Sequence, residues 1–142
     1  LPTWLRHTCA QFAARIGCSL AIVDKRRQKA NVCEVMNIIG SVEGKKVILV
    51  DDMIDTAGTL QAAAAIMEKG AKDVTACATH AVLSGPAIDR IRDSAIKELV
   101  LLDTIPLPEE DASKFTVLPV APLFAEAIER IYEDKPVSPM FV

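Results

Sequence analysis

The sequence predicts an α/β domain with a mostly parallel sheet that is flanked by helices. Two observations lead to this prediction. Short β-branched runs alternate along the 142 residues with segments of helical spacing. Residues 47–50 are four consecutive apolar residues that prefer strands, which is typical of a strand buried on both faces of a parallel sheet. Because there is no internal repeat and no low-complexity linker, we expect a single domain over residues 1–142.

The first half of the chain starts with a helical pattern. Leu5, Cys9, Phe12 and Ile16 fall on one helical face, and Gly17 is suited to end that helix. We expect strands at 19–24, 37–40 and 47–50, a polar loop at 25–35, a turn at 42–45, and a helix from about residue 60 that Gly70 ends.

The second half continues the alternation. Ser84 is a candidate cap for a helix over residues 85–93, with Pro86 in its first turn. Pro119 directly follows a short apolar run, which favours a strand end or a sheet edge. The remaining expected elements are strands within 73–82, at 96–102 and at 115–118, a helix at 123–132, and an irregular tail from residue 136.

Composition argues against several functional classes. The formal net charge is −3 and the pI is about 5.4, so we expect neither general nucleic-acid binding nor membrane-surface binding. No apolar run approaches the roughly 20 residues that span a bilayer, and no secretory signal is evident, so we expect a cytoplasmic protein. The four cysteines have neither C-x-x-C nor metal-ligand spacing, and we expect buried thiols rather than a disulfide: Cys9, Cys18, Cys33 and Cys77.

An acidic turn and a hydroxyl-rich loop follow the central apolar strand. The segment Thr56-Ala57-Gly58-Thr59 can aim backbone N–H groups and two hydroxyls at one point, at the start of a helix, which suits a phosphate monoester. Asp51 and Asp52 would repel a phosphate, but they suit vicinal hydroxyls or a Mg²⁺ ion beside it. The alternative is an acidic strand-end turn before a threonine-capped helix. The spacing favours the phosphate site.

Three cations and a histidine are further candidates. Lys25, Arg26 and Arg27 leave the end of a strand and could neutralise a polyphosphate, but they could equally belong to a solvated loop. His80 lies at a strand end, where a lone histidine is more often structural than catalytic. Neither His80 nor His7 has a Cys or Ser at a spacing that would form a nucleophilic pair.

The acidic turn and its loop resemble the phosphoribosyl-pyrophosphate motif of the type I phosphoribosyltransferase fold. The wider sequence resembles ribose-phosphate pyrophosphokinase, because Lys-Arg-Arg and a Met-Asn-Ile-Ile-Gly segment stand upstream of the motif. The likeness extends from about Gln11 to the end of the chain. The matching segments are 21–27, 31–32, 35–40, 51–59, 78–80, 84–85, 103–106 and 138–141.

This resemblance implies a reaction and a catalytic loop. The 1-hydroxyl of ribose 5-phosphate would attack the β-phosphorus of ATP, releasing AMP, with Mg²⁺ bridging phosphate oxygens. Lys25 and Arg27 become the candidate catalytic residues, at the start of a loop that closes over ATP and continues through 31–36. The resemblance also implies an effector site for phosphate or ADP between subunits, to which Ser138 would contribute.

The same resemblance implies the sugar site. The 5-phosphate would be held by the loop from Asp55 to Thr59, that is Asp55, Thr56, Ala57, Gly58 and Thr59. Asp51 and Asp52 would take the ribose hydroxyls, directly or through the metal.

The chain departs from the family pattern at its start. The family has two related domains, and we expect this chain to correspond to the C-terminal one, without its first strand and with about ten divergent residues at its beginning. Leu1-Pro2-Thr3-Trp4 lacks the aspartate and the glycines of the family's pyrophosphate loop. We therefore expect little or no synthetase activity from this chain alone, and self-association through an unpaired strand edge.

Three interpretations remain open from the residues. The first is a fragment or truncated homologue of the pyrophosphokinase that carries the ribose 5-phosphate site. The second is a phosphoribosyltransferase that uses phosphoribosyl pyrophosphate. The third is a non-catalytic partner of the synthetase.

Overall fold

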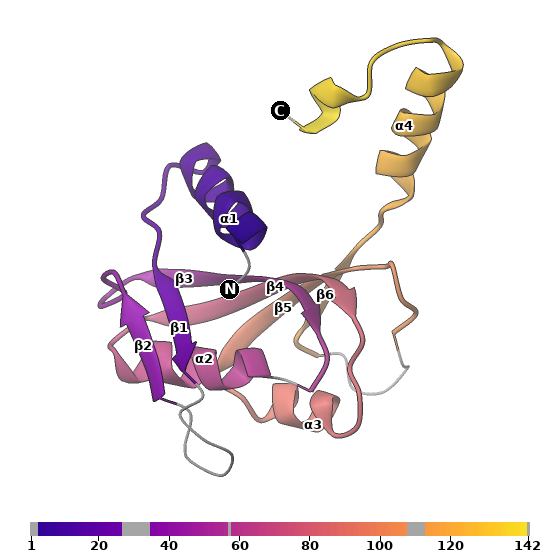
Figure 1. Cartoon of the computed structure of the whole chain (residues 1–142). Helices are drawn as coiled ribbons and strands as arrows, with labels where there is room; N and C mark the ends of the chain where they lie inside the picture. Colours follow the sequence, from indigo (N-terminus) through magenta and orange to yellow (C-terminus); the bar gives the residue numbers. More distant parts are fainter. Residues whose placement is uncertain (1–2, 27–34, 57, 108–112, 142) are drawn as a thin grey trace.

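The computed structural model describes residues 3–26, 35–56, 58–107 and 113–141 (Figure 1). Helices and strands alternate along most of the chain. The elements are α1 (Thr3–Arg15), β1 (Ile22–Arg26), β2 (Val35–Ile39), β3 (Lys46–Ile54), α2 (Gly58–Glu68), β4 (Asp73–Ala81), α3 (Ala87–Arg92), β5 (Ile96–Leu102), β6 (Phe115–Leu118), α4 (Ala121–Tyr132) and a 3₁₀ turn, η1 (Ser138–Phe141).

A parallel sheet of four strands is the centre of the molecule. Its order is β3-β4-β5-β6, and each pair of neighbours is parallel. Figure 1 shows α1 over one face of this sheet and α2 and α3 over the other. The predicted α/β class, with a mostly parallel sheet flanked by helices, is confirmed.

The core lies between the sheet and the α2–α3 layer. Its largest fully buried side chains are aliphatic, and alanines such as Ala63, Ala76 and Ala87 fill the places where the backbones approach closely. The largest fully buried side chains are those of Ile54, Ile66, Val74, Ile91, Ile96, Leu99 and Leu101.

The strand predicted at 47–50, which is β3, is longer and less buried than predicted. β3 does not stop at the acidic pair but continues through Asp51 and Asp52 to Ile54, because it stays paired with β4 up to the Ile54–Ala81 partners. It is also not buried on both faces: the Ile48 side chain is 49% exposed. The physical reason is its position, since β3 ends the order of the four-stranded sheet.

The open side of β3 borders an apolar cavity of about 480 Å³. Six consecutive residues, 45–50, line this cavity, together with Phe12 of α1, Ile16 directly after α1, and Ile66 of α2. Because neighbouring side chains of a strand point to opposite faces, only a cavity along the edge can touch all six. No described strand pairs with this edge.

The segment before β3 is a hairpin rather than a strand, loop and strand of the main sheet. β1 and β2 pair antiparallel as a separate sheet, with Lys25 opposite Met36 and Arg26 opposite Val35. The predicted loop at 25–35 is therefore wrong at both ends, because strand pairing extends over its first and last residues. Its middle, 27–34, lies outside the described residues.

The second half agrees more closely with the prediction. The strands at 96–102 and 115–118 are confirmed, and β6 ends the sheet order, as Pro119 indicates. The predicted Ser84 cap is wrong, since α3 begins at Ala87 behind Pro86 and has no side-chain cap hydrogen bond. The tail is not irregular throughout, because η1 forms over Ser138–Phe141.

The last helix extends away from the sheet (Figure 1). α4 has no buried residue, although one of its faces is strongly apolar. Its exposed large apolar side chains are Leu123, Phe124, Ile128, Ile131 and Tyr132.

Candidate functional site

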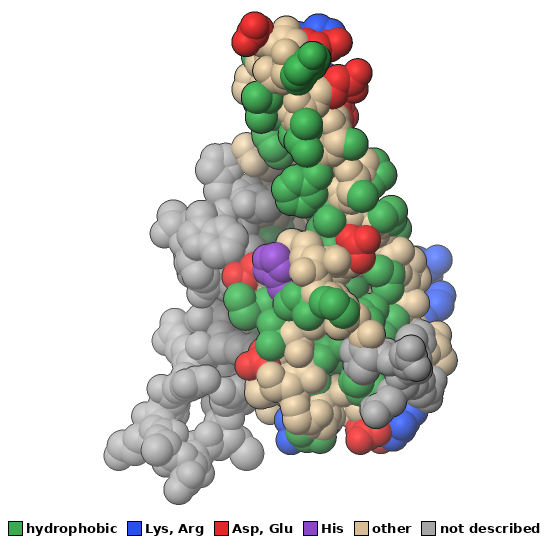
Figure 2. All heavy atoms as spheres, turned by 90° about the vertical axis from the view of Figure 1, so that its right-hand side faces the viewer, with side chains coloured by type: hydrophobic (Ala, Val, Ile, Leu, Met, Phe, Trp, Pro, Cys, Tyr) green, Lys and Arg blue, Asp and Glu red, His purple; other side chains and the backbone are tan. Residues whose placement is uncertain are grey.

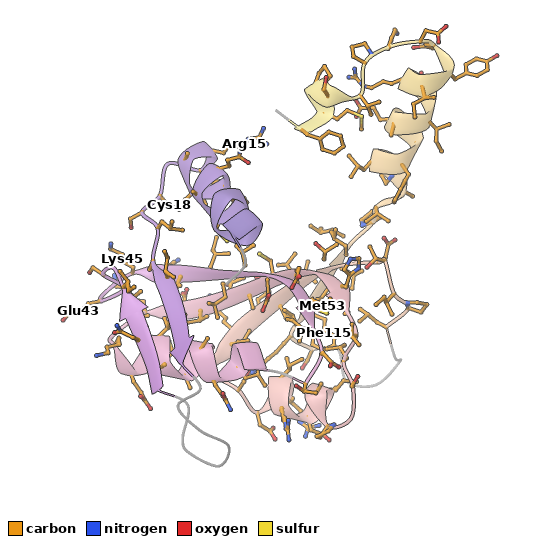
Figure 3. All side chains as sticks on the ribbon, in the orientation of Figure 1. Arg15, Cys18, Glu43, Lys45, Met53 and Phe115 are labelled. Carbon is orange, nitrogen blue, oxygen red and sulfur yellow. The ribbon has the colours of Figure 1, made fainter. Side chains whose placement is uncertain are left out.

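The candidate site lies at the carboxyl edge of the parallel sheet. The carboxyl ends of parallel strands meet at one edge, which is where open α/β sheets bind ligands. Here β3 supplies Asp51 and Asp52, β4 supplies His80, and the residues after β5 are Asp103 and Thr104. Figure 3 shows Met53, which follows the acidic pair, at the other end of β3 from Lys45. The site is thus separate from the cavity along the β3 edge.

The two carboxylates are held by their own backbone. Asp51 Oδ1 accepts a hydrogen bond from the N–H of Asp52 at 3.0 Å, and Asp52 Oδ1 accepts from the N–H of Met53 at 2.9 Å. Both aspartates are only partly buried. Carboxylates anchored in this way present acceptors to a ligand without free rotation.

The predicted phosphate loop connects this acidic turn to a helix. Asp55 and Thr56 are exposed directly after β3, and α2 begins at Gly58. The first N–H groups of a helix have no partner within it, and the helix dipole makes its start favourable for an anion. The binding of a phosphate by this loop stays a prediction. Ala57 lies outside the described residues, and the side chains of Gly58 and Thr59 are not described.

An arginine from the next helix holds this loop. Arg90 Nη1 of α3 donates to the carbonyl oxygen of Thr56 at 3.0 Å. The sequence does not predict this contact, because nothing in the spacing of Arg90 sets it apart from the neighbouring Arg92. Arg92 instead pairs with Asp89 and Asp93 on its own helix, and these carboxylates raise the pKa of its guanidinium, Asp93 most.

A hydrogen-bonded chain joins the ends of β4 and β5. Thr104 Oγ1 donates to the carbonyl oxygen of Thr79 at 2.8 Å, and His80 Nδ1 lies 2.9 Å from Thr104 Oγ1. Asp103 Oδ1 accepts from the N–H of Val120 at 2.8 Å, which fixes the chain behind β6. No local sequence pattern predicts this cluster, because Thr104 reaches its partners across 24 and 25 residues of sequence.

The predicted catalytic and effector residues lie elsewhere. Lys25 lies on β1, and Arg27 is outside the described residues. Ser138 lies on η1, beyond α4. The roles of all three residues stay predictions.

The described cysteines are free thiols in two kinds of environment. Burial raises the pKa of the Cys77 thiol, with a further contribution from nearby Cys9. Burial, and then Asp51, raises the pKa of Cys9. Cys18 is exposed, so the prediction of four buried thiols is wrong for this residue, which follows the end of α1.

The described residues contain neither a metal-binding cluster nor a membrane-spanning helix. Among the described residues, no group of three or more His, Cys, Asp or Glu side chains is placed to hold a metal ion. Within the same residues, no helix has the length and apolarity to cross a bilayer.

The fold and this edge define a phosphoribosyltransferase-like α/β domain with a candidate sugar-phosphate site. The chain belongs to the phosphoribosyl synthetase-associated domain family, whose profile matches residues 9–142.

Related proteins agree with this family. The chain is 64% identical over 132 residues to a ribose-phosphate pyrophosphokinase of Caldanaerobacter subterraneus subsp. tengcongensis, and 59% identical over 133 residues to one of Clostridium acetobutylicum. Each match covers 92% of this chain but 42% of the relative. The crystal structure of phosphoribosylpyrophosphate synthetase from Mycobacterium smegmatis superimposes with a TM-score of 0.80 at 37% identity, covering 90% of this chain and 42% of that one. The chain thus spans less than half the length of these relatives.

Proposed function

We propose that this chain is the ribose 5-phosphate-binding domain of a ribose-phosphate pyrophosphokinase. The observation that carries the proposal is that a short loop joins the end of β3, which contains Asp51 and Asp52, to the first turn of α2 at the carboxyl edge of the sheet. Acceptors for hydroxyl groups next to a helix start that favours an anion are the two functions that a sugar phosphate needs, and this supports the proposal. The names of the similar proteins support the same substrate.

The loop from Asp55 to Thr59 binds the 5-phosphate in this proposal. Thr56 and Thr59 supply hydroxyls, Ala57 and Gly58 supply backbone N–H groups, and Asp55 orders the loop. Arg90 supports it by holding the Thr56 carbonyl. Asp51 and Asp52 accept hydrogen bonds from the ring hydroxyls.

A Mg²⁺ ion fits this donor set as a shared ligand rather than as a caged one. Two carboxylates without a third described metal ligand match the usual Mg²⁺ site, in which one or two carboxylates, waters and substrate oxygens share the ion. Asp51 and Asp52 would hold it. When bound, the ion would neutralise charge on phosphate oxygens.

The complete reaction requires ATP and a second set of contacts. Lys25 and Arg27 are proposed to stabilise charge on the transferred pyrophosphate, with ATP as the second substrate and AMP as the product. Because the chain matches only 42% of the length of its relatives, we expect little or no turnover from these 142 residues alone.

Association with another chain is part of the proposal. The open edge of β3 and the exposed apolar face of α4 both favour contact with a second copy or with a synthetase subunit. Free thiols at Cys9, Cys18 and Cys77 suit a reducing cytoplasm. The acidic net charge favours neither nucleic acid nor membrane as a partner.

Amide NMR titrations test the sugar site. Adding ribose 5-phosphate to the folded chain is expected to shift the N–H signals of residues 55–60 and of Asp52, while inorganic phosphate should shift only the 55–60 group. Unmoved signals in the 55–60 group with both ligands would overturn the proposal. An assay for AMP release with ATP, ribose 5-phosphate and Mg²⁺ should show no robust turnover.

A further inference from the structure

The hydrogen bonds around Thr104 determine which nitrogen of His80 carries a proton. A threonine hydroxyl has a single hydrogen, and a carbonyl oxygen can only accept. Since Thr104 Oγ1 lies 2.8 Å from the Thr79 carbonyl oxygen, its hydrogen is used there. At the 2.9 Å contact with His80 Nδ1, Thr104 Oγ1 must therefore accept, so Nδ1 carries the hydrogen. In the neutral imidazole, Nε2 is then an acceptor with an open lone pair.

The backbone places this acceptor near the acidic residues of β3. His80 is the register partner of Met53 on the neighbouring strand, and Met53 lies two residues after Asp51, so both side chains share a face of the sheet with Asp51. Neighbouring strands lie about 4.8 Å apart, so His80 is within reach of a ligand that contacts the acidic turn. His80 is only partly buried, and Figure 2 shows a histidine side chain and acidic side chains at the surface of one face of the molecule. Only its Nδ1 has a hydrogen-bond partner among the described residues.

The chemistry of this edge selects the ligand group. The carboxylates of Asp51 and Asp52 and the Nε2 of a neutral His80 imidazole all accept hydrogen bonds. Acceptors of this kind bind a group rich in O–H donors, such as a sugar ring. A phosphate would instead need donors, which the start of α2 offers.

We propose that His80 is a specificity-determining residue whose Nε2 accepts a hydrogen bond from a ring hydroxyl of the bound sugar phosphate, with Thr104 holding the required tautomer. The inference rests on the proposed function, because it concerns the same site. It assigns His80 a ligand contact instead of the structural role that its strand-end position indicates.

Two amide substitutions separate the ligand role from a structural one. In His80→Asn the amide overlaps the Nδ1 position, so the contact with Thr104 is kept and the Nε2 acceptor is lost. In His80→Gln the amide oxygen reaches the Nε2 position, so the acceptor is kept. Calorimetric titrations with ribose 5-phosphate and with inorganic phosphate, each at pH 8, measure both variants and the wild type.

We expect His80→Asn to bind ribose 5-phosphate about fivefold to tenfold more weakly, as for one lost hydrogen bond, and His80→Gln to stay within about threefold of wild type. Inorganic phosphate should bind all three proteins equally within about twofold. Wild-type affinity for ribose 5-phosphate in His80→Asn, or an equal loss for both ligands, would overturn the inference. If the wild type does not bind ribose 5-phosphate, the proposed function itself fails.

A measurement on the unmodified protein is independent of these variants. In the ¹⁵N spectrum of histidine-labelled protein, Nδ1 is expected to be the protonated nitrogen of the neutral His80 imidazole, and the signal of Nε2 should move with ribose 5-phosphate but not with phosphate. The chain has two histidines, so the His80→Gln spectrum identifies the signal. A proton on Nε2, or a signal that ribose 5-phosphate leaves unmoved, contradicts the inference.

Discussion

Arg90 Nη1 of α3 lies 3.0 Å from the carbonyl oxygen of Thr56 and donates a hydrogen bond to it. Thr56 belongs to the candidate phosphate loop, so this contact joins the loop to a helix that packs in the core through Ala87 and Ile91. The guanidinium is anchored on a rigid element, whereas the loop itself stands between β3 and α2. Arg90 therefore orders the loop before any ligand arrives, and this lowers the entropy lost on binding.

Replacing Arg90 by alanine should weaken phosphate binding without unfolding the protein. We expect a threefold to tenfold rise in the dissociation constant for inorganic phosphate, about the contribution of one hydrogen bond to a charged donor. Calorimetry gives the constant, and amide hydrogen exchange at residues 55–60 reports the order of the loop. Arg92→Ala is the matched control, because it removes the same charge from the same helix while its partners are Asp89 and Asp93. Equal effects of the two substitutions would show a general charge effect instead.

Strands were predicted correctly where the preferences of neighbouring residues determine their ends. The strands at 96–102 and 115–118 were predicted at their observed ends, because each is a β-preferring run bounded by polar residues or proline. The end of β3 was not predicted. Its aspartates read as a turn, but pairing with β4 extends the strand past them. Tertiary pairing decided this boundary, and a single sequence does not contain it.

The candidate site was predictable to the same degree. The acidic turn and the phosphate loop stand together in the sequence, so their spacing alone indicated a sugar phosphate. Arg90 and Thr104 reach their partners across 34 and 25 residues of sequence. Such contacts depend on how α3 and β5 pack, and no local sequence pattern predicts them.

Gly40 is expected to be sterically required where β2 leaves the hairpin. A Cβ at this position would lie 3.1 Å from Ala21 Cα, Ala21 Cβ and the Leu20 carbonyl oxygen, two of which are backbone atoms that cannot move easily. Gly40→Ala should therefore reduce the free energy of unfolding by about 2–4 kcal/mol, from overpacking and from backbone strain together. Urea unfolding measures this value.

Gly44 provides the control for that substitution. It also has a positive φ, +66°, but a Cβ there would meet no atom within 4 Å. Gly44→Ala should cost about 1 kcal/mol, from the left-handed conformation alone. If the two variants lose equal stability, the close approach to Ala21 is not what makes glycine necessary at position 40.

Lys114 should stabilise the connection between α3 and β5. Its Nζ donates to the carbonyl oxygens of Ile91, near the end of α3, at 3.2 Å and of Ser94, behind it, at 2.9 Å; the Ile91 oxygen also accepts from the Ser94 hydroxyl. Lys114→Met keeps the apolar stem and removes the donors, and we expect a loss of about 1–2 kcal/mol in the free energy of unfolding.

Lys97→Met is the matched change for Lys114→Met. The Lys97 side chain is 68% exposed, with Nζ 3.9 Å from an Asp73 oxygen, so its removal should cost less than about 0.5 kcal/mol. Chemical unfolding compares the two variants at low and at high salt. A loss at Lys97 as large as that at Lys114 would contradict the role of the carbonyl contacts.

The thiol of Cys77 should make the protein less stable in alkaline solution. Burial raises its pKa in the folded chain, and Sγ donates to the carbonyl oxygen of Leu49 at 3.4 Å. Above about pH 8.5 the unfolded chain releases this proton while the folded chain retains it. The unfolded state then binds fewer protons, so the free energy of unfolding falls as pH rises, by at most about 1.4 kcal/mol per pH unit and by less for a partly buried thiol.

Substitution separates this thiol from other alkaline groups. The wild-type slope alone is not sufficient, because it sums over every group that loses a proton in alkaline solution. In Cys77→Ala the fall in unfolding free energy between pH 7.5 and about pH 9.5 should be shallower than in the wild type, because one retained proton is gone. Cys18→Ala, at an exposed cysteine, should keep the wild-type slope. Urea titrations at three pH values give the slopes. If Cys77→Ala follows the wild-type slope, the folded environment does not retain the proton, and the partly buried position of Cys77 beneath α1 has no effect on its ionisation.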